Sequence, residues 1–202
     1  GIEYQIKYDD ENKEITISDG KRSRTISFKD KLAYYSQDIL WETIKTLPVD
    51  TLLTIDDHAK KWNYCREEDS AADGYTHTIS TGKKEGVISH ETGHFKDYET
   101  QFSINNKNFL RTYSNEMKIF LNTTPYNEQE FIQYFSPRAT LNDATGTNEF
   151  AAETNIILTT YGTNYERLKT RAQFLARYFP KTIAITAELL GKTSKISLLE
   201  ED

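Results

Sequence analysis

Two histidines flanking a glutamate form the clearest chemical motif of the chain. His90-Glu91-Thr92-Gly93-His94 follows the HExxH pattern, in which imidazoles four residues apart share a helix face and can ligate one metal ion. Glu91 lies about 100° around such a helix, where it can contact a zinc-bound water without ligating the metal. Zinc lowers the pKa of that water from about 15.7 to near 7, so Glu91 can act as general base. The pattern predicts one Zn²⁺ per chain and hydrolysis; a helix with two solvated histidines is the alternative.

A third ligand is needed, because two histidines leave a tetrahedral zinc incomplete and no further histidine follows. Glu149 and Glu153 lie four residues apart in an apolar stretch, which favours a partly buried carboxylate pair facing something positive. We predict Glu149 as the ligand, because Asn148 and a loop at Gly146 would let its helix begin close to the metal. Glu153 is predicted to accept a hydrogen bond from a ligand imidazole, preferably that of His90. Two solvated helix glutamates are the alternative.

The first 85 residues are predicted to form mainly strands. Residues 31–47 change to an apolar spacing of three and four, which predicts an amphipathic helix that ends before Pro48. Asp56 and Asp57, next to His58, are interpreted as a helix N-terminus, where acidic side chains are favoured. Residues 66–74 are polar and loop-like. Alternation or short apolar runs predict strands at residues 2–8, 15–17, 25–28, 51–55 and 75–80.

The strand predicted just before the HExxH segment carries a candidate substrate rim. Tyr75, His77 and Ile79 alternate along it and so fall on one side. An extended peptide could pair beside this strand and contact these three side chains. An exposed strand histidine is the simpler interpretation of His77.

From residue 86 onward the apolar period is helical. A run of strands followed by a run of helices indicates an α+β fold, with a small twisted N-terminal sheet, the active-site helix and a C-terminal helical part. We expect one domain over residues 1–202, β-rich to about 85, and interpret the start at Gly1 as a cut from a longer protein. The best candidate for a long functional loop is 136–148. Helices are predicted at 87–100, 106–122, 127–135, 148–160, 164–178 and 180–190.

Composition excludes several classes of partner. A net charge of −6 and a pI near 5.4 argue against a nucleic-acid partner. No apolar run approaches the roughly 20 residues of a transmembrane helix, and no signal peptide is visible. The single Cys65 excludes an intramolecular disulfide and argues against a cysteine-rich zinc site.

These motifs resemble the gluzincin peptidases, and more closely the catalytic domains of the anthrax lethal factor family. Four segments carry the resemblance in matching order: 86–94 with Asp97 and Tyr98 behind it, 147–153, 166–169 and 179–183. They fall within residues 86–190, about half the chain. The resemblance implies a zincin-like fold, zinc ligation by His90, His94 and Glu149, and Glu91 as the base.

The resemblance further implies a toxin-like endopeptidase that cleaves a host protein. Such an effector would be secreted or delivered into a target cell, with a delivery partner or additional domains. The lone cysteine fits work in a reducing cytosol. Two alternatives stay open: a secreted pro-pro endopeptidase of the same broad family, and a non-catalytic binding module that retains zinc as a structural staple.

One departure from the family pattern concerns the oxyanion. The family places a tyrosine a few residues before the ligand glutamate, whereas the corresponding positions here are Asn142, Thr145 and Gly146. We therefore expect the oxyanion donor to lie elsewhere in the cleft. Possible substitutes are Tyr98, Tyr134 and Tyr161.

Overall fold

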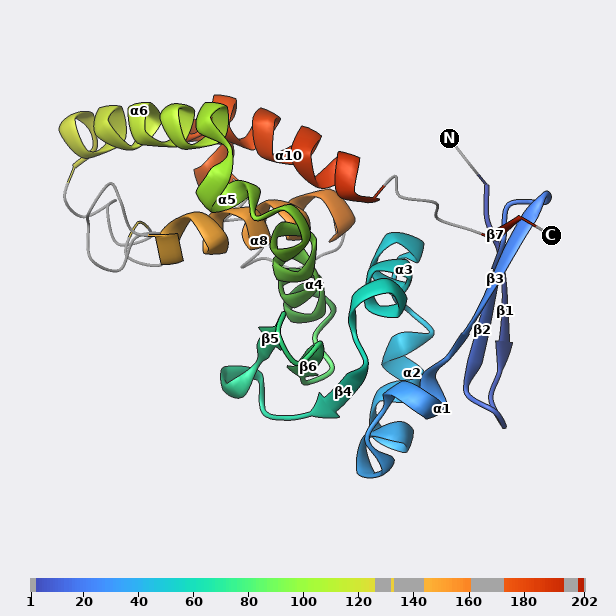
Figure 1. The fold of residues 1–202 in the computed structure, drawn as a ribbon. Coiled ribbons are helices and arrows are strands. Elements are labelled where there is room, and N and C mark those ends of the chain that lie inside the picture. The colour runs from blue at the N-terminus through green and yellow to red at the C-terminus, as the bar shows by residue number, and fades with distance from the viewer. Residues whose placement is uncertain (1–2, 126–131, 133–143, 161–172, 195–199, 202) are drawn as a thin grey trace.

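Two small sheets and a set of helices surround one central helix (Figure 1). The structure is a computed structural model that describes residues 3–125, 132, 144–160, 173–194 and 200–201. Short strands and helices build the first part of the chain, and the described residues after 85 are mostly helical. The predicted α+β class is therefore confirmed.

The first sheet is an antiparallel meander. Ile15, Ile17 and Ile26 are fully buried in it, so alternate residues of these strands face the core, as period-two patterning predicts. The last described strand pairs with the third and returns the C-terminal segment to this sheet. The predicted hairpin and third strand are confirmed. In spatial order the strands are β1 (Gln5–Asp9), β2 (Glu14–Ser18), β3 (Arg22–Ser27) and β7 (Glu200–Glu201).

The helix predicted over residues 31–47 is broken in the structure. Leu32 and Ala33 are extended: Leu32 bridges to Trp62, and the Ala33 N–H donates to the Trp62 carbonyl at 3.0 Å. This pairing with a strand 30 residues away interrupts the helix, and local periodicity cannot report it. The segment forms α1 (Phe28–Lys31), a 3₁₀ turn η1 (Tyr34–Ser36) and α2 (Gln37–Ile44).

The strand predicted at 51–55 is wrong, because these residues lie in α3 (Val49–His58). Five consecutive residues, 51–55, are buried, so this helix lacks the polar stripe by which a helical period is recognised. His58 and the two aspartates before it accordingly end a helix instead of beginning one.

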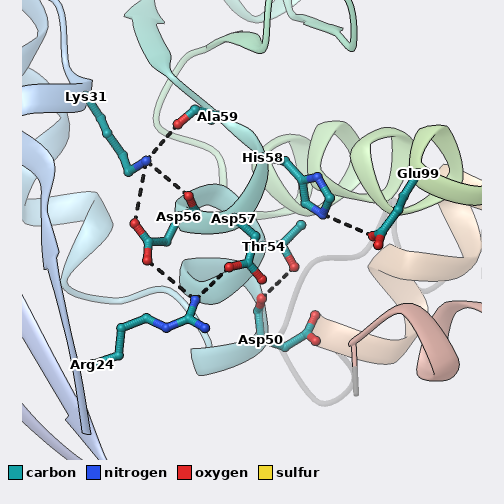
Figure 2. Close-up of polar contacts among 9 residues, drawn as sticks. All are labelled: Arg24, Lys31, Asp50, Thr54, Asp56, Asp57, His58, Ala59 and Glu99. Carbon is teal, nitrogen blue, oxygen red and sulfur yellow. Dashed lines mark hydrogen bonds and ion pairs between the residues drawn. The ribbon is translucent and has the colours of Figure 1, made fainter. Parts of the chain in front are cut away.

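Polar contacts join α3 to the first sheet and to the central helix (Figure 2). Arg24 on β3 contacts Asp57 at 2.7 Å and Asp56 at 3.4 Å. The Lys31 ammonium donates to the carbonyls of Asp56 and Ala59 at 3.1 and 2.8 Å, which suits the negative end of the α3 dipole. On the other side of α3, His58 lies 3.4 Å from Glu99.

The second sheet has three strands, β4 (Lys61–Tyr64), β5 (Ala71–Asp73) and β6 (Thr78–Thr81), in the order β4-β6-β5. β6 runs parallel to β4 and antiparallel to β5. The strand predicted at 75–80 exists but begins only at Thr78. β4 was not predicted, and the segment interpreted as a polar loop contains the 3₁₀ turn η2 (Glu67–Asp69) and β5.

The helices predicted at 87–100 and 106–122, and the helix start predicted at residue 180, agree with the structure to within two residues. The short helix at 102–105 was not predicted. α8 (Ala144–Thr160) begins four residues earlier than predicted, so Gly146 and Asn148 lie within the helix and not in a loop before it. Residues 136–143, most of 127–135 and 164–172 lie outside the described residues, while 173–178 are helical. None of the described helices is long and apolar enough to cross a membrane. Beyond residue 84, the helices with described bounds are α4 (Glu85–Thr100), α5 (Phe102–Asn105), α6 (Lys107–Thr123), α8 (Ala144–Thr160) and α10 (Pro180–Ser194).

The structure has two apolar cores: α4, at the centre of Figure 1, belongs to the first, and α8 belongs to the second. Ile88 and Phe95 of α4 belong to the first core, together with both sheets, α2 and α3. The second core is rich in aromatic rings, and Phe150 of α8 packs edge-on against Phe109 and Phe179 with centroids 6.3 and 5.6 Å apart. Each core therefore holds one of the two helices that carry the HExxH motif and the glutamate pair, and the two helices pack against each other.

Candidate metal centre

Both ends of α4 are fixed by specific contacts. At its start, the Lys84 N–H donates to Oε1 of Glu67 at 3.3 Å. Glu67 covers Gly82, where an added Cβ would lie 2.0 Å from that oxygen, so a larger residue there would displace the Glu67 side chain. Near the other end, Asp97 accepts from the backbone N–H and the hydroxyl of Ser103 at 3.0 and 2.6 Å. The HExxH residues thus lie in the middle of an anchored helix.

α8 approaches α4 most closely at Gly93. A Cβ added to Gly93 would lie 2.8 Å from Cβ of Asn155 and 2.9 Å from Cα of Ala152. Helix axes approach this closely only where a side chain is missing from the contact. The close approach brings Glu149 and Glu153 of α8 within reach of the α4 histidines.

Donor atoms of three side chains converge between the two helices. Nε2 of His90 and Nε2 of His94 lie 3.2 Å apart. Oε2 of Glu149 lies 2.9 Å from the first nitrogen, and Oε1 lies 3.4 Å from the second. Within the described part of the chain, these residues form the only group of three or more histidine, cysteine or acidic side chains spaced to hold a metal ion. The structure therefore brings together the three ligands predicted from the sequence.

The spacing of these donors fits a tetrahedral ion. Bonds of about 2.0–2.1 Å at tetrahedral angles place ligand atoms about 3.3 Å apart. The two imidazole nitrogens lie 3.2 Å apart, and each has one oxygen of the Glu149 carboxylate at 2.9 or 3.4 Å. Oε2 of Glu149 is buried and makes no hydrogen bond of acceptable geometry. A buried carboxylate is costly without a positive partner. Protonated His90, 2.9 Å away, supplies one in the metal-free protein, and a cation between the donors would take its place.

The metal centre is supported by its own geometry and by the chemistry of its donor atoms. No family model, curated protein or solved structure matches the chain. Two imidazoles and one carboxylate are a donor set that Zn²⁺ uses in catalytic sites, where a fourth position stays open for water or substrate. The arrangement can therefore hold a metal ion with one free coordination position.

Charges in the centre are strongly coupled. Burial disfavours the charged form of His90, but contacts with Glu149 and Glu153 outweigh it and raise the pKa of the imidazole to about 10. Burial opposes ionisation of Glu149 as well, yet His90 and His94 hold its pKa well below the usual range of a glutamate. Without metal, the pair His90 and Glu149 is consequently ionised at neutral pH, and a bound cation must displace the His90 proton.

Glu153 lies on the far side of the His90 ring from the donor cluster. Its side chain is almost fully buried, and Oε1 lies 3.3 Å from Nδ1 of His90. An acceptor at Nδ1 favours the proton there and leaves the Nε2 lone pair facing the cluster. Glu153 is therefore placed where the sequence predicts an orienting carboxylate, one helical turn from Glu149.

Glu91 is buried beside the donor set, with only 6% of its surface exposed. Burial raises the pKa of its carboxyl, and the charges of His90 and His94 partly counteract that rise. A carboxyl whose pKa moves toward neutrality can both accept and return a proton. This property suits the general base that the HExxH pattern predicts.

The predicted substrate rim is wrong as a strand face. Ile79 is in β6 but fully buried in the first core. Tyr75 lies in a turn that begins where Asp73 Oδ1 accepts the N–H groups of Tyr75 and Thr76. His77 has a left-handed backbone with φ of 55°, and its Nδ1 lies 3.1 Å from the His58 carbonyl. The Asp73-Gly74 dipeptide is a turn signal that could have predicted this reversal.

Of the three tyrosines considered as oxyanion donors, Tyr98 alone lies within the described residues. The Tyr98 ring packs edge-on against Tyr75, with centroids 5.6 Å apart, and covers Gly74. Tyr134 and Tyr161 lie outside the described residues, as does Asn142, whereas Thr145 and Gly146 belong to α8. A donor from outside the usual tyrosine position stays a prediction.

Two polar residues near the centre were missed from the sequence. Lys96 of α4 and Asn155 of α8 are both buried, and the Lys96 ammonium donates to Oδ1 of Asn155 at 2.9 Å. The available signal was a single amide between Glu153 and the apolar residues that follow. Its partners depend on how the helices cross, which the sequence does not show.

Proposed function

We propose that this chain is a zinc-dependent endopeptidase. The observation that carries the proposal is the convergence of His90, His94 and Glu149, with a buried Glu91 beside them. This combination provides three metal ligands and a separate proton acceptor, which are the parts that metal-assisted peptide hydrolysis requires. The resemblance of the motifs to the lethal factor family supports the same conclusion.

In the proposed reaction, His90, His94 and Glu149 would hold the zinc, and Glu153 keeps the His90 ring oriented. Bound zinc would polarise the scissile carbonyl and acidify the attacking water. Glu91 accepts the proton that this water loses and returns it to the leaving amine. The pKa of Glu91, raised by burial, brings it nearer to the range in which both transfers are easy.

The proposed substrate is an extended segment of a protein. β6 has a strand on each side, so it offers no free edge, whereas the outer edge of β5 carries no other strand among the described residues. β5 also lies against α4. A peptide would therefore add beside Ala71–Asp73, where main-chain hydrogen bonds give affinity independent of sequence. Action as a secreted or delivered effector on a host protein is part of the same proposal.

Digestion of an unbiased peptide library tests the activity. Zinc-loaded protein should cleave internal peptide bonds, a chelator should abolish cleavage, and added zinc should restore it. Alignment of the cut sites separates a protease selective for paired prolines from one with another preference. Full zinc loading without any cleavage, of peptides or of folded proteins, would instead favour a binding module with a structural zinc.

A further inference from the structure

Both polar atoms of the Asn155 side-chain amide make hydrogen bonds to residues of α4. Nδ2 donates to the Ser89 carbonyl at 2.7 Å and to Oγ1 of Thr92 at 3.4 Å, and Oδ1 accepts from Lys96 at 2.9 Å. The side chain is fully buried. The reverse orientation of the amide would point its NH₂ group at an ammonium, so the hydrogen-bond network itself assigns the two atoms.

Lys96 makes a displacement of α8 along α4 costly. Its side chain is 4% exposed, and besides Asn155 it contacts Asp50 of α3. A buried ammonium needs both a counter-charge and hydrogen-bond acceptors. Asp50 supplies the charge and Asn155 an acceptor, so a displacement of α8 would leave Lys96 short of an acceptor.

Apart from the contacts of Glu149 and Glu153 with the α4 histidines, the remaining contacts between these helices set their distance more than their register. Gly93 and Ala152 meet at the closest point, and residues this small present a smooth surface along which helices can slide. Ser89 Oγ and Thr159 Oγ1, 2.7 Å apart, form a second polar contact, but hydroxyl groups rotate to suit new partners. The rigid amide of Asn155 matches three groups of α4 at one register only.

Sliding matters because the metal ligand is on the same helix. Asn155 follows Glu149 by six residues, about 9 Å along α8. A slip of a single residue would move Glu149 by about 1.5 Å, whereas metal–ligand distances tolerate only about ±0.2 Å. The register of α8 therefore decides whether Glu149 reaches the ion.

We infer that Asn155 is a positioning residue that fixes the register of α8 against α4 and so delivers Glu149 to the metal. The inference rests on the proposed zinc site but not on peptidase activity. It also explains why a fully buried amide lies two residues beyond Glu153.

The test compares Asn155→Leu, Asn155→Asp and the matched control Thr154→Val. Thr154 is equally buried on α8, but its hydroxyl donates at 2.9 Å only to Phe150 of the same helix. Zinc affinity is measured by competition with a chromophoric chelator, coordination by the visible spectrum of the Co²⁺-substituted protein, and folding by thermal unfolding without metal. Asn155→Leu should weaken zinc binding about 10–100-fold and alter the Co²⁺ spectrum. Asn155→Asp keeps the Lys96 contact but loses donation to Ser89, so its loss should be smaller.

The control defines what a merely structural role would look like. Thr154→Val should lower thermal stability while its zinc affinity and Co²⁺ spectrum match wild type. The inference is overturned if the folded Asn155 variants bind zinc within about twofold of wild type with an unchanged spectrum, or if neither variant folds. Wild-type protein that binds no zinc would be a different result, because it removes the proposed function and the inference with it.

Discussion

Gly93→Ala is the sharpest perturbation of the packing that assembles the metal centre. The new methyl group would lie 2.8 Å from Cβ of Asn155 and 2.9 Å from Cα of Ala152, whereas carbon atoms in contact prefer about 3.5–4.0 Å. α8 would have to retreat by about 0.6–1 Å, because the Ala152 contact is with backbone. Glu149 moves with α8, by several times the tolerance of about 0.2 Å that a metal ligand has.

Two opposing effects act on the stability of this variant. Alanine is favoured over glycine in a helix interior by about 1 kcal/mol, while overpacking costs about 1–3 kcal/mol. The net change should be a loss of about 0–2 kcal/mol in the metal-free protein, accompanied by a large loss of zinc affinity. Denaturant unfolding measures the first quantity, and competition with a chromophoric chelator measures the second.

Gly191→Ala provides the matched control. Gly191 is also in a helix, α10, but nothing lies within 4 Å of its added Cβ. This variant should gain up to about 1 kcal/mol from helix propensity and bind zinc as wild type does. If Gly93→Ala instead resembled Gly191→Ala in both assays, the close approach of α8 would not be what sets the centre.

The ionisation of the centre and the two glutamates give further predictions. The pKa of His90 is about 10 in the folded protein and 6.5 in the unfolded chain. Protonated His90 therefore stabilises the fold fully below pH 6.5, and this stabilisation is lost as the pH rises toward 10. Unfolding curves of the metal-free protein from pH 6.5 to 10 should show a falling midpoint. Zinc displaces the same proton, so affinity should rise about tenfold per pH unit from pH 7 to 10, and titration calorimetry in two buffers should detect proton release. An affinity independent of pH would contradict the ionised His90. Glu149→Ala should remove most of the zinc, as measured by equilibrium dialysis, whereas Glu153→Gln should cost about 10–100-fold; equal losses would reject the distinct roles of the two carboxylates.

The residues of the centre could be predicted from the sequence, because their spacing alone places them on one face of a helix. His90 and His94 lie on one helix face wherever an HExxH helix forms, and Glu149 and Glu153 repeat that spacing in an apolar helix. The residues that hold these two helices in place could not be predicted in this way. Asn155 and Lys96 are 59 residues apart in the sequence and meet only where their two helices cross. No local pattern encodes such a crossing.

The fold followed the same division between local and long-range causes. Amphipathic helices such as α6 (Lys107–Thr123) were predictable from their apolar period. The helical segment 51–55 was mistaken for a strand, because burial on all sides erased that period. The short polar strand Lys61–Tyr64 was missed, because it is defined by its pairing with β6 rather than by alternation of its own.

Glu91→Gln tests the central claim most directly, with zinc content and peptide hydrolysis measured on the same sample. The substitution preserves the shape of the side chain and removes its ability to accept a proton. Because Glu91 is assigned to proton transfer and not to the metal, the variant should retain about one zinc per chain while its turnover falls by about 10²–10⁴-fold. Near wild-type turnover in the zinc-loaded variant, or loss of its zinc, would contradict this assignment.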